Sequence, residues 1–210
     1  MFIEMNGLKV LVIGGGEEGT KKAKRFSEHG ADVSVLSLDF SDQLLDMEKM
    51  GKVRLIKENA DNLSLVEKLV EESDIVVYTV GDRPDLERKV EKIVRRKRKL
   101  LNLATNADRT QVVMPIEERV GEIRVAITSE GKSTLVVKEV AKRVADFLKG
   151  QKDLMAMLDV MGHLKKYMRE KGVPFERRME IYRSAFADER LRKLALSDVE
   201  EAKRYAESLI

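Results

Sequence analysis

Apolar positions in the first hundred residues fall into two alternating patterns. Short, nearly continuous apolar runs predict buried strands at residues 9–13, 32–36, 53–56, 74–80 and 100–104. Apolar positions three and four residues apart predict helices at residues 19–28, 42–50, 63–72 and 84–98. Such alternation of strands and helices is typical of a parallel, doubly wound sheet. We therefore predict an α/β, Rossmann-like domain at residues 1–112.

The pattern changes beyond this domain. Residues 122–128 alternate between apolar and polar, which predicts one strand, and an amphipathic helix is expected at 133–148. Further along, the apolar spacing predicts only helices, at residues 152–170, 174–186, 188–195 and 197–209. The predicted architecture is a small α+β region at 113–149 and a helical C-terminal domain at 150–210.

The first predicted strand runs directly into a glycine-rich turn that opens the first helix. Residues 14–19 read Gly-Gly-Gly-Glu-Glu-Gly and contain the spacing Gly14-x-Gly16-x-x-Gly19. A strand before and a helix after are the context in which this spacing binds a dinucleotide. Gly14 lets the chain turn sharply, Gly16 lets the backbone approach a pyrophosphate, and Gly19 lets the helix pack close to the strand. A tight turn that holds no ligand is the alternative.

Composition narrows the possible partners. Charged residues make up 37% of the chain, but they nearly cancel to a net charge of +3, so the charge by itself does not indicate nucleic acid. The basic run at 95–99 suits a solvated helix end, and an anionic small substrate is the second interpretation. The chain has no tryptophan, which argues against platforms that stack single-stranded bases.

The same counts bear on metals and on location. There is no cysteine, which excludes disulfides, thiolate nucleophiles and cysteine-ligated metals. The two histidines, His29 and His163, are far apart in the sequence, so no resident metal is expected. No apolar run approaches the ~20 residues of a membrane span, and no signal peptide is recognised. We expect a cytoplasmic protein with no membrane partner.

Several further segments resemble the precorrin-2 dehydrogenase / sirohydrochlorin ferrochelatase family, the siroheme-synthase module. The segments that carry the resemblance follow one another along nearly the whole chain: the glycine turn with Thr20–Arg25, Gly30–Val35, Met114-Pro115 followed by Arg119, Val125–Ser133, Glu176–Arg178 and Asp188–Leu191. The resemblance implies that the chain binds NAD in its first domain and oxidises precorrin-2 to sirohydrochlorin by passing a hydride to NAD⁺. Several members of the family also insert Fe²⁺ as a substrate.

The resemblance also implies where the substrate binds and how the chain assembles. A tetrapyrrole cleft is expected, with basic side chains for the substrate's carboxylates, and the candidate substrate-binding residues are Met114, Pro115, Ser129, Lys132 and Ser133. The middle region, 113–149, is expected to form a homodimer together with the helical tail. The tail carries apolar positions at helical spacing that need burial: Leu154, Met157, Leu158, Met161 and Leu164.

Cofactor contacts are expected at the ends of the predicted strands. The candidates are Gly14, Gly15, Gly16, Glu17, Glu18, Gly19, Ser37, Asp39, Thr79, Val80, Gly81, Asn102 and Ala104. Asp39 follows the second strand and is the candidate for the ribose hydroxyls, or else a residue at a helix start. No arginine at 36–44 is placed to take a 2′-phosphate, so NAD is favoured over NADP.

One departure from the family concerns proton transfer. The family has an aspartate that acts as general acid/base three residues after the asparagine that Asn102 matches, and here that position is Thr105. A threonine hydroxyl does not ionise near neutral pH. The nearest carboxylate, Asp108, is the second catalytic candidate, acting through a shifted loop. The alternatives are chemistry by water and positioning alone, or an activity that has drifted.

We therefore expect oxidation of precorrin-2 with poor or absent ferrochelatase activity, because iron insertion must remove two pyrrole protons. A catalytically drifted nucleotide- or tetrapyrrole-binding protein of the same family is the alternative. A regulatory Rossmann-type domain with a partner-binding tail is the third interpretation.

Overall fold

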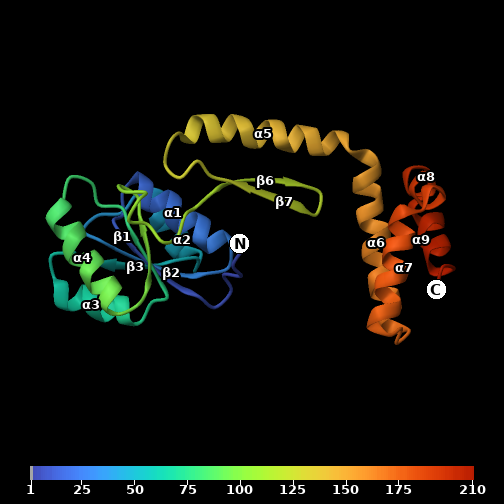
Figure 1. Ribbon diagram of the computed structural model, residues 1–210. Coiled ribbons are helices and arrows are strands. Elements are labelled where there is room, and N and C mark those ends of the chain that lie inside the picture. The colour runs from blue at the N-terminus through green and yellow to red at the C-terminus, as the bar shows by residue number, and fades with distance from the viewer. Residues whose placement is uncertain (1) are drawn as a thin grey trace. The chain divides into compact units, whose positions relative to one another are not determined.

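The computed structural model describes residues 2–210, and their contacts divide into two compact units (Figure 1). The first unit runs to Met114 and takes in Glu130–Lys132, and the second holds Pro115–Ser129 and Ser133–Ile210. This boundary lies two residues beyond the predicted end of the first domain. The predicted separation of 113–149 from 150–210 stays a prediction.

The first unit is built on a five-stranded parallel sheet in the order β3-β2-β1-β4-β5. The strands are β1 (Lys9–Ile13), β2 (Asp32–Ser37), β3 (Arg54–Lys57), β4 (Ile75–Tyr78) and β5 (Leu100–Leu103). In the register, Val12 of β1 lies between Val35 of β2 and Val77 of β4. The predicted α/β, Rossmann-like class is confirmed. Chain progression reverses between β1 and β4, so the ligand crevice of such a sheet is expected at the carboxyl ends of these two strands.

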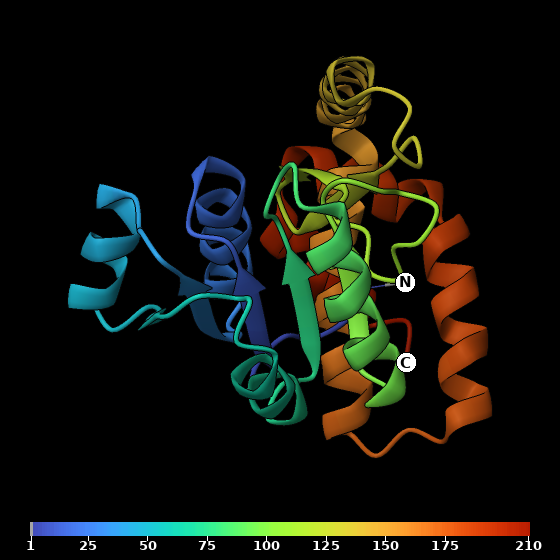
Figure 2. The same cartoon turned by 90° about the vertical axis from the view of Figure 1, so that its left-hand side faces the viewer.

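Two pairs of helices bury the two faces of this sheet (Figure 2). They are α1 (Glu17–Glu28), α2 (Asp42–Lys49), α3 (Leu63–Glu71) and α4 (Pro84–Arg96). Val10 and Val12 pack with the side chains of α1 and α2, whereas Leu11 and Ile13 pack with those of α3 and α4. Both faces of β1 are thus covered, which explains why its sequence is a continuous apolar run. Each buried aliphatic side chain contributes about 1.5–3 kcal/mol.

The second unit combines a hairpin with a set of helices. Its elements are β6 (Ile116–Val120), β7 (Ile123–Ile127), α5 (Thr134–Gly150), α6 (Lys152–Glu170), α7 (Phe175–Ala187), α8 (Glu189–Ser197) and α9 (Val199–Glu207). Strand β6 pairs antiparallel with β7, and α5 packs on the hairpin. The sequence did not predict β6, because Ile116–Val120 lacks an apolar alternation of its own. Pairing with β7 makes it a strand.

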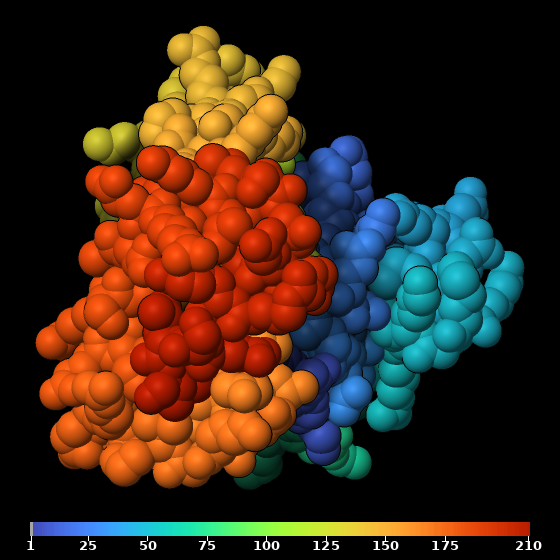
Figure 3. Space-filling model, turned by 90° about the vertical axis from the view of Figure 1, so that its right-hand side faces the viewer, coloured from blue at the N-terminus to red at the C-terminus, as the bar shows by residue number. Residues whose placement is uncertain are grey.

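Helices α6 to α9 bury a core of their own. Met157, Met161 and Leu164 of α6 are buried, as their spacing predicts, together with Leu191 of α8. Leu154 and Leu158, from the same predicted set, are 39% and 38% exposed. Figure 3 shows these helices as a closely packed, space-filled surface. The helical tail therefore has a core within the chain itself.

Candidate active site

The turn between β1 and α1 requires glycine at two positions, because neither position has room for a side chain. Gly14 has φ = +115°, a conformation that side chains disfavour, and a Cβ there would lie 2.5 Å from Thr79 Oγ1. A Cβ on Gly19 would overlap the Gly14 carbonyl oxygen and lie 2.8 Å from the Gly14 carbon. The sharp turn at Gly14 and the close packing of α1 at Gly19 both require glycine.

Gly16 differs from both, because the space beside its α-carbon is open. A Cβ there would meet no atom within 4 Å, and the residue is exposed. As the N-cap of α1, Gly16 carries no side chain to accept from the first-turn amides. Helix-start amides beside an open glycine form a cradle that fits a pyrophosphate, with the positive end of the helix dipole behind it. Glu17 and Glu18 are exposed in this turn, and both pair with Lys21.

The segment after β2 lies directly against the glycine turn. A Cβ on Gly15 would overlap the Asp39 carbonyl oxygen and lie 2.9 Å from Ser37 Cβ. The Asp39 side chain is exposed, so its carboxylate is open to a ligand at this point. Lys57 at the end of β3 lies in register beside Ser37. A search of residues 36–44 for a cation could not find this lysine, because only the pairing of β2 with β3 brings it there.

The loop after β4 reaches the same turn from the other side. The Thr79 hydroxyl donates to the carbonyl oxygens of Ile13 at 3.0 Å and of Gly14 at 3.3 Å. Val80 is half-buried and Gly81 is exposed. The ends of β1 and β4 are thereby fastened together at the point where open α/β sheets bind their ligands.

Asn102 lies on β5 and is buried, whereas Ala104 lies just after this strand and is exposed. Asn102 is 4% exposed, and its side-chain amide donates to the Val112 carbonyl oxygen at 2.6 Å. Among the described residues, Asn102 Oδ1 is the buried side-chain oxygen that has no hydrogen-bond partner. Ala104 is exposed, and its amide donates to the Tyr78 carbonyl oxygen at 3.1 Å. Asn102 holds the following segment against β5, and Ala104 lies at the open edge.

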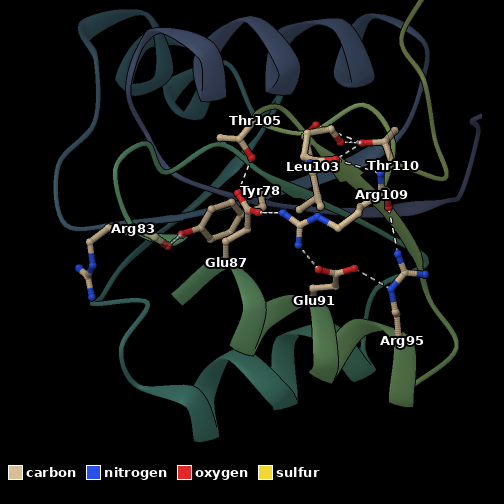
Figure 4. Close-up of polar contacts among 10 residues, drawn as sticks. Tyr78, Arg83, Glu87, Glu91, Arg95, Leu103, Thr105, Arg109 and Thr110 are labelled. Atoms are coloured by element: carbon tan, nitrogen blue, oxygen red, sulfur yellow. Dashed lines mark hydrogen bonds and ion pairs between the residues drawn. The ribbon is translucent and has the colours of Figure 1, made fainter. Parts of the chain in front are cut away.

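Thr105 lies beside a buried carboxylate that the sequence did not single out (Figure 4). The Thr105 hydroxyl hydrogen-bonds Glu87 Oε2, and Arg109 Nη2 pairs with Glu87 Oε1. Glu87 is 6% exposed, while Thr105 is exposed. Glu87 lies in the first turns of α4 and would ordinarily be a solvated charge. Only the packing of the loop after β5 against α4 reveals it, and no local sequence signal does.

Arg109 joins Glu87 to a second carboxylate, Glu91, which also accepts from Arg95 at 2.8 Å (Figure 4). Partial burial alone would raise the pKa of Glu91, but the hydrogen bond from Arg95 and the charge of Arg109 outweigh it, and the pKa is lowered. Hydrogen bonding to Glu87 raises the pKa of Arg109. Tyr78 faces the same cluster, and burial, with the nearby charge of Glu87, raises its pKa to about 12.

The remaining candidates lie in two loops. Asp108 is exposed in the loop after β5, two residues before Thr110, whose hydroxyl accepts from the Leu103 amide at 2.9 Å. In the turn before α5, Ser129 Oγ accepts from the Ser133 amide at 3.0 Å, and Ser133 caps α5.

Lys132 in this turn is exposed, and Met114 packs on the sheet face beneath α1 and α2. Pro115 follows it directly and begins the second unit. Gly131, between Ser129 and Ser133, lies so close to Ala107 that a Cβ on the glycine would be 2.6 Å from Ala107 Cβ. Gly131 and Ala107 both belong to the first unit, so this contact lies within it, at the loop that carries Thr105 and Asp108.

The basic run at the end of α4 takes part in surface ion pairs. Arg96 pairs with Glu67 at 2.9 Å, and Lys97 pairs with Glu67 and Glu71 at 3.3 Å each. These contacts favour the interpretation of the run as a solvated helix end.

Neither histidine lies in a metal cluster. His29 Nδ1 contacts the Arg25 carbonyl oxygen at the end of α1, and His163 Nε2 contacts Glu207 at 2.6 Å. Across residues 2–210, no three His, Cys, Asp or Glu side chains are grouped as a metal site. Over the same part of the chain, every helix is too short or too polar to cross a bilayer.

Known proteins were compared with this chain. A family model described as "Putative NAD(P)-binding" matches residues 1–116. A "Putative precorrin-2 dehydrogenase" of Methanocaldococcus jannaschii is 22% identical over 92% of this chain and 92% of its own length. The precorrin-2 dehydrogenase of Methanosarcina barkeri is 27% identical over 86% of this chain and 79% of its own length. Siroheme synthase 2 of Pectobacterium atrosepticum is 23% identical over the whole chain, which spans 44% of that protein.

The solved structures agree with this result. One described as "SirC, precorrin-2 dehydrogenase" superposes with a TM-score of 0.71, covering 99% of this chain and 98% of that one at 20% identity, which shows a shared fold. The resemblance found in the sequence is thereby confirmed. With the glycine turn, the open cradle at Gly16 and a family model that matches more than half of its length, the chain belongs to this NAD(P)-binding family.

Proposed function

We propose that this protein oxidises precorrin-2 to sirohydrochlorin by removing a hydride to NAD⁺. The observation that carries the proposal is the similarity along 92% of the chain to a protein named as a precorrin-2 dehydrogenase. The geometry supports it, since the open cradle at Gly16 fits a pyrophosphate. When bound, the nicotinamide ring supplies the hydride acceptor, and the protein positions the substrate carbon against it.

NAD is the proposed cofactor rather than NADP. The exposed Asp39 carboxylate lies beside the glycine turn, where it can accept from ribose hydroxyls and would repel a 2′-phosphate. Lys57 is a cation on the neighbouring strand, in register with Ser37. Titration of the wild type with both cofactors decides the matter, and a Lys57→Ala variant that keeps its preference for NAD would exclude this lysine as its cause.

The proposed assembly is a homodimer that uses α5. One stripe of this helix, with Val137, Ala141 and Ala145, is buried against the hairpin. A second apolar stripe is exposed and holds Val136 (61%), Val140 (41%) and Phe147 (66%), and Leu135 (79%) is exposed at the start of the same helix. Apolar side chains this exposed on one helix are typical of an interface. A symmetric dimer is the commonest closed assembly.

The decisive assay mixes the protein with precorrin-2 and NAD⁺ without oxygen, with and without Fe²⁺. Formation of NADH together with sirohydrochlorin is expected, and the arm with Fe²⁺ measures whether iron is inserted. A Gly16→Val variant is the matched control, since it should keep the fold and lose cofactor binding. Tetrapyrrole binding without NADH formation would instead indicate a binding protein that has lost catalysis, as the threonine at position 105 allows.

A further inference from the structure

The hydrogen bond between Thr105 and Glu87 has a fixed direction. Glu87 Oε1 is paired with the guanidinium of Arg109, which indicates that the carboxyl group is ionised. An ionised carboxylate has no proton to give, so the Thr105 hydroxyl is the donor and Glu87 Oε2 the acceptor. The threonine proton points inward, and its oxygen lone pairs remain for a group outside.

The position of Thr105 lets its outward-facing oxygen meet a bound ligand. The residue is exposed just beyond the carboxyl end of β5, next to the end of β4, where Ala104 N bonds to the Tyr78 carbonyl oxygen. That is the edge of the sheet at which the cofactor crevice is expected. A ligand at this edge meets an oxygen that can only accept, and that oxygen is coupled to a buried carboxylate.

We propose that Glu87 is the carboxylate that takes up the substrate proton in this site and that the Thr105 hydroxyl transfers it. This inference rests on the proposed function. As a C–H bond of the tetrapyrrole gives up its hydride to the nicotinamide, a second hydrogen leaves as a proton, and its bonding electron pair completes the new double bond. That proton passes to Thr105 Oγ1 while the threonine's own proton passes to Glu87 Oε2, and it returns to water by the same path after product release.

The charges around Glu87 suit this role. Arg109 also pairs with Glu91, so it keeps an ionic partner when Glu87 becomes neutral. Glu91 has two guanidinium partners, Arg95 and Arg109, and its pKa is lowered. Thr105 contacts Glu87 and not Glu91, so a proton that the hydroxyl hands on reaches Glu87.

The other groups packed against Glu87 do not compete for the proton. The Tyr78 hydroxyl donates to the Arg83 carbonyl oxygen at 3.3 Å, and with a pKa raised to about 12 it stays protonated. The charged side chains around Glu87 are those of Arg109, Arg95 and Glu91, and the Arg83 side chain turns away from them and pairs with Asp61 at 2.6 Å (Figure 4).

The test compares four single variants. Glu87→Gln keeps the shape and removes the proton acceptor, and Glu91→Gln, the matched control, removes a carboxylate from the same arginine without touching Thr105. Thr105→Val removes the hydroxyl at nearly constant volume, and Thr105→Ser keeps it. Positioned proton transfer contributes about 10²–10⁴-fold to rates. We expect Glu87→Gln and Thr105→Val to lower kcat at least about 100-fold, with KM and NAD⁺ affinity within about threefold.

Glu91→Gln leaves the contact between Thr105 and Glu87 in place but removes the second partner of Arg109, so it should lower kcat by no more than about tenfold, and Thr105→Ser should recover most of the kcat that Thr105→Val loses. The double variant Glu87→Gln/Thr105→Asp, which supplies a carboxylate directly at the exposed position, should recover kcat at least about tenfold over Glu87→Gln. If Glu87 had only a structural role, a carboxylate at position 105 would not restore kcat in this double variant.

A readout without turnover completes the test. In the protein without cofactor, the carboxyl-carbon NMR signal of Glu87, identified by its loss in Glu87→Gln, should shift in Thr105→Val and titrate at a different pH. Full activity of Thr105→Val, equal losses in Glu87→Gln and Glu91→Gln, or an unmoved Glu87 signal would each overturn the inference. Absence of NADH formation by the wild type would instead contradict the proposed function, and the NMR result would still judge the contact.

Discussion

Replacing two glycines of the same turn should separate folding from cofactor binding. Gly16→Val places a side chain in open, exposed space, whereas Gly19→Ala drives a methyl group into the backbone of Gly14. The first change should leave the fold intact and weaken NAD⁺ binding. The second should destabilise the fold itself.

The magnitudes follow from these surroundings. At Gly19 the clash is with backbone atoms, which cannot rotate away, so an overpacking cost near 3 kcal/mol applies, at the upper end of the usual range. Alanine regains about 1 kcal/mol of helix propensity inside α1, which leaves a net loss of about 2 kcal/mol. At Gly16 the weaker capping by valine costs up to about 1 kcal/mol, and the reduced freedom of the unfolded chain offsets most of it.

Thermal unfolding and calorimetric titration with NAD⁺ measure both effects. For a chain of this size, about 2 kcal/mol corresponds to a fall in Tm of about 4–8 °C for Gly19→Ala, against about 2 °C or less for Gly16→Val. NAD⁺ affinity of Gly16→Val should fall at least about tenfold, or 1.4 kcal/mol. Unchanged affinity in that variant would refute the assignment of the pyrophosphate to this cradle. An unchanged Tm for Gly19→Ala would contradict the close approach of α1 to the Gly14 carbonyl.

Three further outcomes are expected. Asp39→Asn should shift the preference between NAD⁺ and NADP⁺ toward NADP⁺ by about tenfold in parallel titrations, because a carboxylate that repels the 2′-phosphate is removed; an unaltered preference would show that another group sets it. The wild type should be a dimer by light scattering at micromolar concentration, and Val136→Glu with Phe147→Glu should make it monomeric, because glutamates on the exposed stripe of α5 would be buried without a cationic partner; a monomeric wild type would count against the proposed interface. Asp188→Ala should destabilise the protein by about 1 kcal/mol at pH 7 in urea titrations, since Asp188 caps α8. The hydrogen bond from the Leu191 amide, helped by the Tyr205 hydroxyl, lowers the pKa of Asp188, so its contribution is full above the unfolded-state pKa of about 3.9 and is lost as pH falls through the lower folded-state value; a cost that stays constant into acid would exclude this origin.

Much of the first unit was predictable because its signals are local. The buried strands are recognisable as apolar runs because helices cover both faces of the sheet. Gly14 and Gly19 are required by the steric limits of a single turn. Helix spacing likewise indicated the tail, where Met157 and Leu164 are buried as expected. These features depend on neighbours a few residues away, so one sequence suffices to predict them.

Only the tertiary structure decided the features that depend on residues far apart in the chain. Ile116–Val120 is a strand because β7 supplies its hydrogen bonds, not because of its own pattern. Lys57 comes beside Ser37 through the pairing of β3 with β2. Glu87 meets Thr105 across 18 positions because α4 packs beneath the loop that follows β5. A local pattern predicts which element a residue belongs to, whereas the packing of elements decides which side chains meet, and for that reason the sequence indicated the glycine turn but not the contact between Glu87 and Thr105.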